Sequence, residues 1–188
     1  MELTATDKRI LALGVASTVF EGTMYLFVVF WSPAVISARK AVNPSVSHDP
    51  PFGLIFASFM AAMMFGSQLF AYLMRPSSSQ LPLESEDPIP TSLGRASWLL
   101  KTLLPLACSC LSWSVFRPTE VSTLWAFCVY EMAIGAYFPS MGVLKSLLVE
   151  GTHRASVYAL FRVPLNCFVV AGLALTKEAH CYWWLWAL

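Results

Sequence analysis

Three ionisable residues lie inside long apolar runs of this sequence: Glu21, Glu131 and Arg162. On insertion scales, each charge costs roughly 2.5–3.5 kcal/mol at the centre of a bilayer. Such residues usually face a bundle interior or a water-filled path, where they bind ions or carry protons. A guanidinium offers forked donors that match an oxyanion, and a buried carboxyl can hold a proton. We therefore predict that these three residues belong to a substrate pathway.

Neutral polar side chains accompany the charged ones at helical spacing. Tyr25 follows the first carboxylate by one turn, and Tyr158 and Asn166 flank Arg162 at four-residue steps. We predict that these three side chains line the same pathway. Two interpretations of the charges remain open. Glu131 and Arg162 form a structural ion pair, or Arg162 binds an anion while the carboxylates carry protons.

Small residues recur on two of the apolar runs. Ser58, Ala62 and Gly66 are spaced by four, which is the small-xxx-small pattern that lets membrane helices approach closely. Gly135 and Gly142 lie on the same run as the second carboxylate. We predict that all five residues are helix-packing positions.

The composition identifies the class of protein that must position these residues. Of the 188 residues, 57% are hydrophobic and only 12% are charged, against about a quarter charged in soluble domains. The net charge of +1, without a basic patch, excludes a nucleic-acid-binding module. The sequence therefore predicts a membrane protein with no nucleic-acid partner, surrounded by the lipid bilayer.

Five apolar runs are long enough to span a bilayer, since a spanning helix needs about 20 residues. The predicted fold is an all-α integral membrane domain covering 1–188, with about five transmembrane helices. The predicted spans are 10–31, 52–74, 96–116, 121–144 and 155–175. Residues 75–95 are rich in Ser, Pro and acidic residues and are predicted to form a cytoplasmic linker. Residues 32–51 are predicted to form an external loop.

The distribution of Lys and Arg predicts the orientation. More basic residues flank the span ends on the side of the N-terminus than on the other side. By the positive-inside rule, the N-terminus is predicted to lie in the cytoplasm of a multi-pass cell-membrane protein.

Motifs for catalysis or metal binding do not occur in the sequence. The five cysteines form no C-x-x-C, and the three histidines lie in three separate connections. The sequence also has no G-x-S-x-G and no phosphate-binding glycine loop. We predict a protein that is not an enzyme and that has no metal and no cofactor.

Four sequence blocks resemble one family of carriers in order and spacing. The first consists of residues 20–22 (FEG), 25–28 (YLFV) and 30–33 (FWSP). The others are residues 51–62 (PFGLIFASFMAA), 131–141 (EMAIGAYFPSM) and 161–165 (FRVPL). The four blocks are similar to helices seven, eight, ten and eleven of the molybdate-anion transporters, a branch of the major facilitator superfamily. The resemblance covers most of the chain.

This resemblance implies a carrier of molybdate across the plasma membrane, represented here by its C-terminal half. Glu21, Glu131 and Arg162 fall within matching blocks, so the resemblance also implies that they are pathway residues. Sulfate and tungstate share the tetrahedral geometry of molybdate, and the residues themselves do not separate these anions.

Two hypotheses about function follow. The first is a partial or truncated carrier for molybdate or a similar oxyanion, which would need another carrier half or a second copy of itself, because alternating access requires two halves. The alternative is a non-transporting membrane partner or regulator of a full-length carrier.

Overall fold

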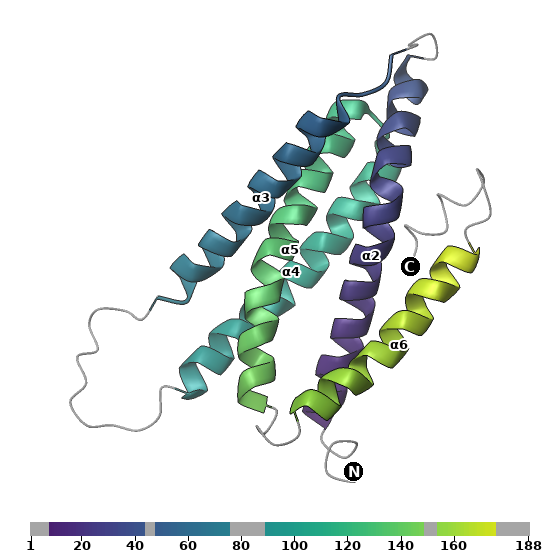
Figure 1. Ribbon diagram of the computed structural model, residues 1–188. Coiled ribbons are helices and arrows are strands. Elements are labelled where there is room, and N and C mark those ends of the chain that lie inside the picture. Colours follow the sequence, from purple (N-terminus) through teal and green to yellow (C-terminus); the bar gives the residue numbers. More distant parts are fainter. Residues whose placement is uncertain (1–7, 44–47, 76–88, 149–153, 176–188) are drawn as a thin grey trace.

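The computed structural model describes residues 8–43, 48–75, 89–148 and 154–175, which form five α-helices (Figure 1). The helices are α2 (Lys8–Val42), α3 (Phe52–Leu73), α4 (Ile89–Phe116), α5 (Glu120–Leu148) and α6 (Arg154–Leu175). All five are long and apolar enough to cross a membrane. The described part of the chain contains no strand. The predicted all-α membrane fold with about five spans is confirmed.

The first span is longer than predicted. It does not end at the boundary of 10–31 but continues through Pro33 to Val42, so the first part of the predicted external loop is helical. This extension buries Val35 and Ala38, whose exposed fractions are 1% and 3%. Packing of this kind offsets the hydrogen bond that a proline removes from a helix.

The third span begins earlier than predicted, at Ile89 instead of Ala96. Residues 89–95 of the predicted linker are therefore helical, and residues 76–88 of it lie outside the described residues. Pro90 suits the first turn, because its missing N–H is one that a helix start leaves unpaired anyway. The ends of the other three spans differ from the prediction by four residues or fewer.

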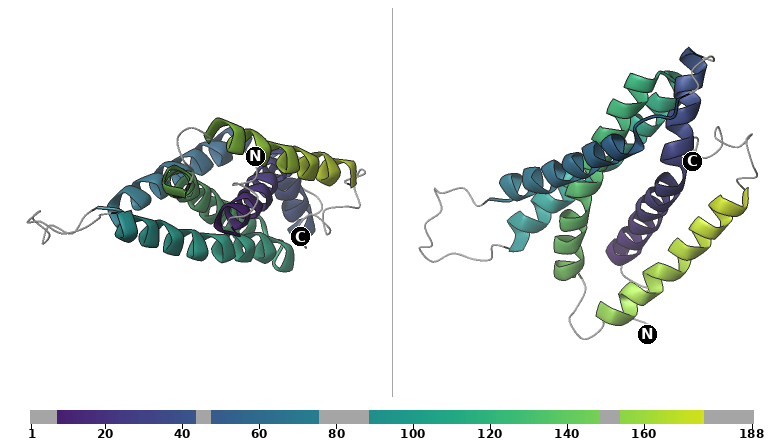
Figure 2. Two further views of the ribbon diagram at one scale, coloured as in Figure 1. Left: turned by 90° about the horizontal axis from the view of Figure 1, so that it is seen from below. Right: turned by 45° about the horizontal axis from the view of Figure 1, so that its top comes forward.

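The helices are arranged around α5, which packs against α3, α4 and α2. Figures 1 and 2 show α6 at the edge of the bundle beside α2, the helix against which it mainly packs. Successive helices run in opposite directions (Figure 1), so the start of α2, the end of α3 and the end of α5 share one end of the bundle. Arg75, which follows α3, and Lys145, in the last turn of α5, are among the basic residues at that end. The side of the membrane on which it lies stays a prediction.

An aromatic cluster joins α2 to α5. The rings of Phe20 and Tyr137 stack with their centroids 4.1 Å apart. Phe27 lies 4.8 Å from Tyr130 and 5.0 Å from Phe127, measured between ring centroids. Tilted and edge-to-face rings attract one another beyond the effect of simple burial. The cluster therefore fixes the face of α5 that meets α2.

Two glycines bring α3 and α5 into backbone contact. A Cβ atom added at Gly66 would overlap the carbonyl oxygen of Met132 on α5. Reciprocally, a Cβ atom at Gly135 would overlap the carbonyl oxygen of Met63 on α3. The two helices therefore approach each other more closely than any residue with a side chain would permit at these positions.

The other three predicted packing residues differ in their surroundings. Ser58 lies at the α3–α5 interface, because its Oγ is 3.9 Å from Sγ of Cys128. Ala62, one turn along α3, is half-buried. The prediction is wrong for Gly142, which is exposed and where an added Cβ atom would meet no atom within 4 Å. Glycine recurrence alone did not reveal that this position lies on an open part of α5.

The helices α2 and α6 pack against each other where bulky side chains of one contact glycines of the other. Phe161 of α6 lies against Gly14 and Phe168 against Gly22, while Leu26 of α2 lies against Gly172. The residue numbers of the contacting partners increase together along both helices, so α2 and α6 run parallel. These three glycine contacts position the polar residues of α6 relative to α2.

We expect Gly22→Ala to destabilise the docking of α6, because the new methyl group would overlap the ring of Phe168. Overpacking of this kind costs roughly 1–3 kcal/mol. Thermal unfolding in detergent micelles should show the loss, and adding Phe168→Ala should relieve the overlap. The control is Gly53→Ala, where an added Cβ atom meets nothing within 4 Å. Equal effects of the two glycine substitutions would contradict this account of the α2–α6 contact.

Candidate functional site

The carboxylate of Glu21 is the centre of a polar network within the membrane-spanning region. Its Oε1 atom accepts hydrogen bonds from Ser17 Oγ at 2.6 Å, Tyr137 Oη at 3.3 Å and Lys145 Nζ at 3.4 Å. Lys145 Nζ also donates to Ser17 Oγ at 3.3 Å. The Lys145–Glu21 contact is an ion pair whose side chains are 19% and 20% exposed. The network therefore holds one positive and one negative charge that solvent can partly reach.

Helical periodicity explains why these side chains meet. Ser17 precedes Glu21 by four residues on α2, so the two share a face. Tyr137 precedes Lys145 by eight residues on α5, which is two repeats of the same spacing. The aromatic stacking of Phe20 on Tyr137 brings the two faces together.

The network extends to α6 through Tyr158. Lys145 Nζ lies 5.6 Å from the centroid of the Tyr158 ring, within the range of a cation–π interaction. Three helices, α2, α5 and α6, thus contribute to one site. Because α6 packs mainly against α2, this contact links it to the central helix as well.

The structural ion pair considered between Glu131 and Arg162 is not formed in the described part of the chain. The cation that pairs with an intramembrane carboxylate is Lys145, and its partner is Glu21. Glu131 is only 5% exposed, and its Oε2 atom is buried without a hydrogen-bond partner among the described residues. Arg162 is exposed on the edge helix α6. The helices separate these two residues because α6 does not pack on α5 as α2, α3 and α4 do.

The six predicted pathway residues therefore do not form a single site. Glu21 and Tyr158 belong to the network, whereas Glu131 lies buried in the bundle. Tyr25 is 50% exposed, and Arg162 and Asn166 are also exposed. These three side chains lie on faces of α2 and α6 that no described helix covers.

Sequence reasoning missed three members of the network: Ser17, Tyr137 and Lys145. Lys145 lies in the last turn of α5, and its position near a span end favoured a role at the membrane interface. The sequence signals for these residues were the eight-residue spacing from Tyr137 to Lys145 and the four-residue spacing from Ser17 to Glu21. Each spacing places the pair on one face of a helix. Both are common on helices, so only the packing of α2 on α5 could single them out.

A second ion pair joins the opposite ends of the same two helices. Arg39 Nε lies 3.6 Å from Glu120 Oε2, and these side chains are 25% and 40% exposed. The pair ties the end of α2 to the start of α5. Its greater exposure makes it a weaker contribution to stability than the Lys145–Glu21 pair.

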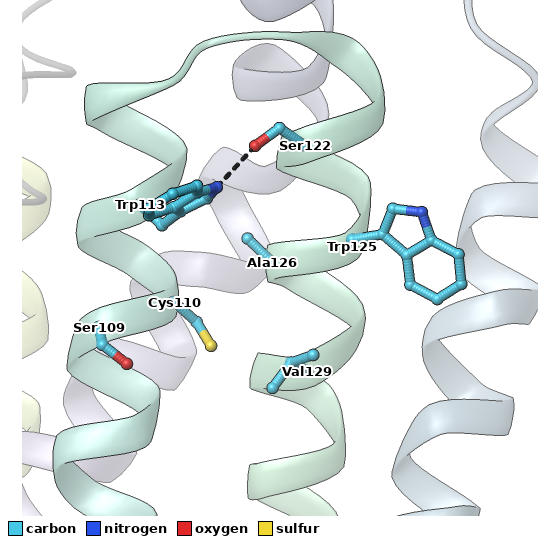
Figure 3. Close-up of a pocket in the computed structure, with 7 residues that line it drawn as sticks. All are labelled: Ser109, Cys110, Trp113, Ser122, Trp125, Ala126 and Val129. Atoms are coloured by element: carbon cyan, nitrogen blue, oxygen red, sulfur yellow. Dashed lines mark hydrogen bonds between the residues drawn. The ribbon is translucent and has the colours of Figure 1, made fainter.

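A pocket of about 330 Å³ lies between α4 and α5 but does not suit an anion (Figure 3). Cys110 and Trp113 of α4 lie opposite Ala126 and Ser122 of α5. The indole N–H group in the pocket is already hydrogen-bonded, because Trp113 Nε1 donates to Ser122 Oγ at 2.8 Å. The lining contains no charged residue. Among the described residues, no cluster of three or more His, Cys, Asp or Glu could hold a metal ion either.

Comparison with known proteins identifies relatives. Residues 2–82 match the model of a family described as sugar transporters with 12 TM segments. The chain is 32% identical over 170 residues to a molybdate-anion transporter of Danio rerio, covering 89% of this chain and 31% of that protein. It is also 32% identical over 173 residues to a molybdate-anion transporter of Xenopus tropicalis, covering 92% of this chain and 34% of that protein. No solved structure matches the chain significantly. The chain thus spans about a third of the length of the curated relatives it matches.

Proposed function

We propose that the chain belongs to the molybdate-anion transporter family of the major facilitator superfamily and forms part of a carrier for molybdate or a similar tetrahedral oxyanion. Within that proposal it is the C-terminal half of the carrier, in the plasma membrane, with its N-terminus in the cytoplasm. The excess of basic residues at the end where α2 begins supports this orientation.

One observation carries the proposal: polar side chains of α2 and α6 lie on a face that the described helices leave open. Arg162 is exposed within a membrane-spanning helix, and so are Tyr25 and Asn166. An arginine facing lipid costs roughly 2.5–3.5 kcal/mol or more, so intramembrane charges normally face protein or water. A second carrier half over this face would enclose a polar path between the two halves, as alternating access requires.

The two intramembrane carboxyl groups have different roles in this proposal. Glu21 lies in the partly exposed network and takes part in the pathway. Glu131 has no cationic partner among the described residues and is enclosed by the bundle, so it takes no part in the pathway.

We expect the chain expressed alone to insert into membranes but to give little molybdate uptake, because one half cannot alternate access. Uptake of radioactive molybdate by cells or proteoliposomes measures this directly. Robust uptake by the 188-residue chain, lost in Arg162→Ala, would contradict the need for a different half and would support a carrier formed by two copies.

A chimera tests the carrier role itself. This chain would replace the matching segment of the Danio rerio relative, which aligns over 170 residues, so that the rest of that protein supplies the remainder of the carrier. We expect the chimera to take up molybdate and its Arg162→Ala variant to lose most of that uptake. Failure of a chimera that reaches the membrane in a folded form would overturn the proposed function. Co-purification with a full-length carrier, without uptake by the chimera, would instead favour the non-transporting partner.

A further inference from the structure

The ammonium group of Lys145 is held loosely in the network. Its hydrogen bonds to Glu21 and Ser17 measure 3.4 and 3.3 Å, whereas charge-assisted N–H···O⁻ bonds are usually about 2.7–2.9 Å long. The side chain is 19% exposed, and an ammonium group has three donors. Lys145 can therefore exchange its partner without leaving a buried donor unpaired.

Glu21 is held independently of Lys145. Ser17 donates to its Oε1 atom at 2.6 Å and Tyr137 donates to the same atom at 3.3 Å. The carboxyl group therefore keeps its position when Lys145 moves away. The same two hydroxyl groups accommodate either the charged or the protonated carboxyl, since a hydroxyl can donate or accept.

A second cation lies close to this site along α6. Arg162 follows Tyr158 by four residues, so it lies on the same flank of α6, one turn beyond the ring that Lys145 contacts. Arg162 is exposed and forms no ion pair within the described residues. A tetrahedral dianion needs two positive charges for neutrality, and Lys145 and Arg162 would supply them from two helices.

We infer that Lys145 is the residue that binds the oxyanion, with Arg162 as its second cation, and that Glu21 competes with the oxyanion for Lys145. When Glu21 takes up a proton, it loses the negative charge that holds Lys145, and the ammonium becomes available to the anion. When the proton leaves, the carboxylate displaces the anion from Lys145. Proton and oxyanion therefore bind together and leave together. This inference rests on the proposed function.

The titratable and charged groups that face Glu21 are few. Among the described residues they are Tyr137 and Lys145 from α5, while Tyr158 of α6 contacts Lys145 and Arg162 follows Tyr158 by one helical turn. Glu131 is 14 residues from Lys145 on α5, which is about 21 Å along the helix axis. We therefore assign the pH dependence of binding to Glu21 and not to Glu131.

Equilibrium binding of radioactive molybdate to the whole chain in lipid nanodiscs, at pH 4 and pH 7.5, tests this inference. We expect wild-type protein to bind more tightly at the lower pH. Glu21→Gln should bind equally at both values, because its side chain is always uncharged. Lys145→Met should weaken binding at least tenfold, the usual effect of losing one hydrogen bond to a charged group. Arg39→Met is the matched control, because it breaks an ion pair between the same two helices away from the site.

The double variant Glu21→Gln/Lys145→Met is the control for loss of binding caused by misfolding, because it leaves no unpaired charge in the network. We expect it to fold, by circular dichroism, and to bind molybdate no better than Lys145→Met. Binding that is unchanged in Lys145→Met or in the folded double variant would overturn the inference while supporting the proposed function. Unchanged pH dependence in Glu21→Gln would overturn the role of the proton. Absence of binding by the wild-type chain would also overturn the inference, and the uptake of the chimera would then decide the proposed function separately.

Discussion

Gly135→Ala is expected to destabilise the protein by about 3 kcal/mol or more, at the upper end of what overpacking costs. The added methyl group would overlap the carbonyl oxygen of Met63 on the neighbouring helix. A side chain can rotate out of such a clash, but a backbone carbonyl cannot. The helices α3 and α5 would have to separate along the interface that contains Ser58 and Cys128. Because α5 is the central helix, its contacts with α2 and α4 would be disturbed as well.

Unfolding by increasing mole fractions of sodium dodecyl sulfate in mixed micelles measures this loss. Gly66→Ala should behave similarly, since its Cβ atom would overlap the carbonyl oxygen of Met132. Gly142→Ala is the matched control on α5 itself, because nothing lies within 4 Å of an added Cβ atom there. A Gly135→Ala protein as stable as Gly142→Ala would contradict the close approach of α3 and α5.

Lys145→Met is expected to destabilise the protein by roughly 1.5–3 kcal/mol, the range for hydrogen bonds to a charged group, because the ion pair is only partly buried. The carboxylate of Glu21, whose side chain is 20% exposed beside Lys145, would be left without its cation between α2 and α5. The cation–π contact with Tyr158 would also be lost, which loosens α6. Glu21→Gln should cost less, because the amide oxygen still accepts from Ser17 and Tyr137.

A double-mutant cycle over Glu21 and Lys145 measures the interaction itself, since coupled neighbours show interaction energies of about 0.5–3 kcal/mol. The Arg39–Glu120 pair provides the comparison on the same two helices. Its side chains are 25% and 40% exposed, so its coupling should lie within about 0–1 kcal/mol. Equal interaction energies for the Glu21–Lys145 and Arg39–Glu120 pairs would show that burial does not set the strength of these ion pairs.

The open face of α2 and α6 connects stability with function. The edge helix α6 is attached by contacts between bulky side chains and glycines and by one cation–π contact, whereas α3, α4 and α5 share a continuous core. Substitutions such as Gly22→Ala are therefore expected to affect α6 more than the core. In the proposed carrier, α6 would gain further contacts from the half that covers Arg162 and Asn166.

The sequence by itself determined the fold class and the approximate positions of most helices. Apolar runs of about 20 residues with few charges have no other stable environment than a membrane or its equivalent, and they must be helical there, because lipid offers the backbone no hydrogen bonds. The same reasoning could not place the end of the first span. At Pro33 the local propensity favours a break, while the burial of Val35 and Ala38 favours continuation, and burial depends on the neighbouring helices.

Only the tertiary structure decided which charges meet. Intramembrane charge identified Glu21, Glu131 and Arg162 as unusual, but helical periodicity specifies which residues share a face of one helix and not which faces of two helices are joined. The stacking of Phe20 on Tyr137 turned Glu21 toward Lys145, which lies just beyond the predicted fourth span. The position of α6 at the edge of the bundle kept Arg162 from Glu131. Partner choice among buried charges is a property of helix packing, which depends on contacts far apart in the sequence.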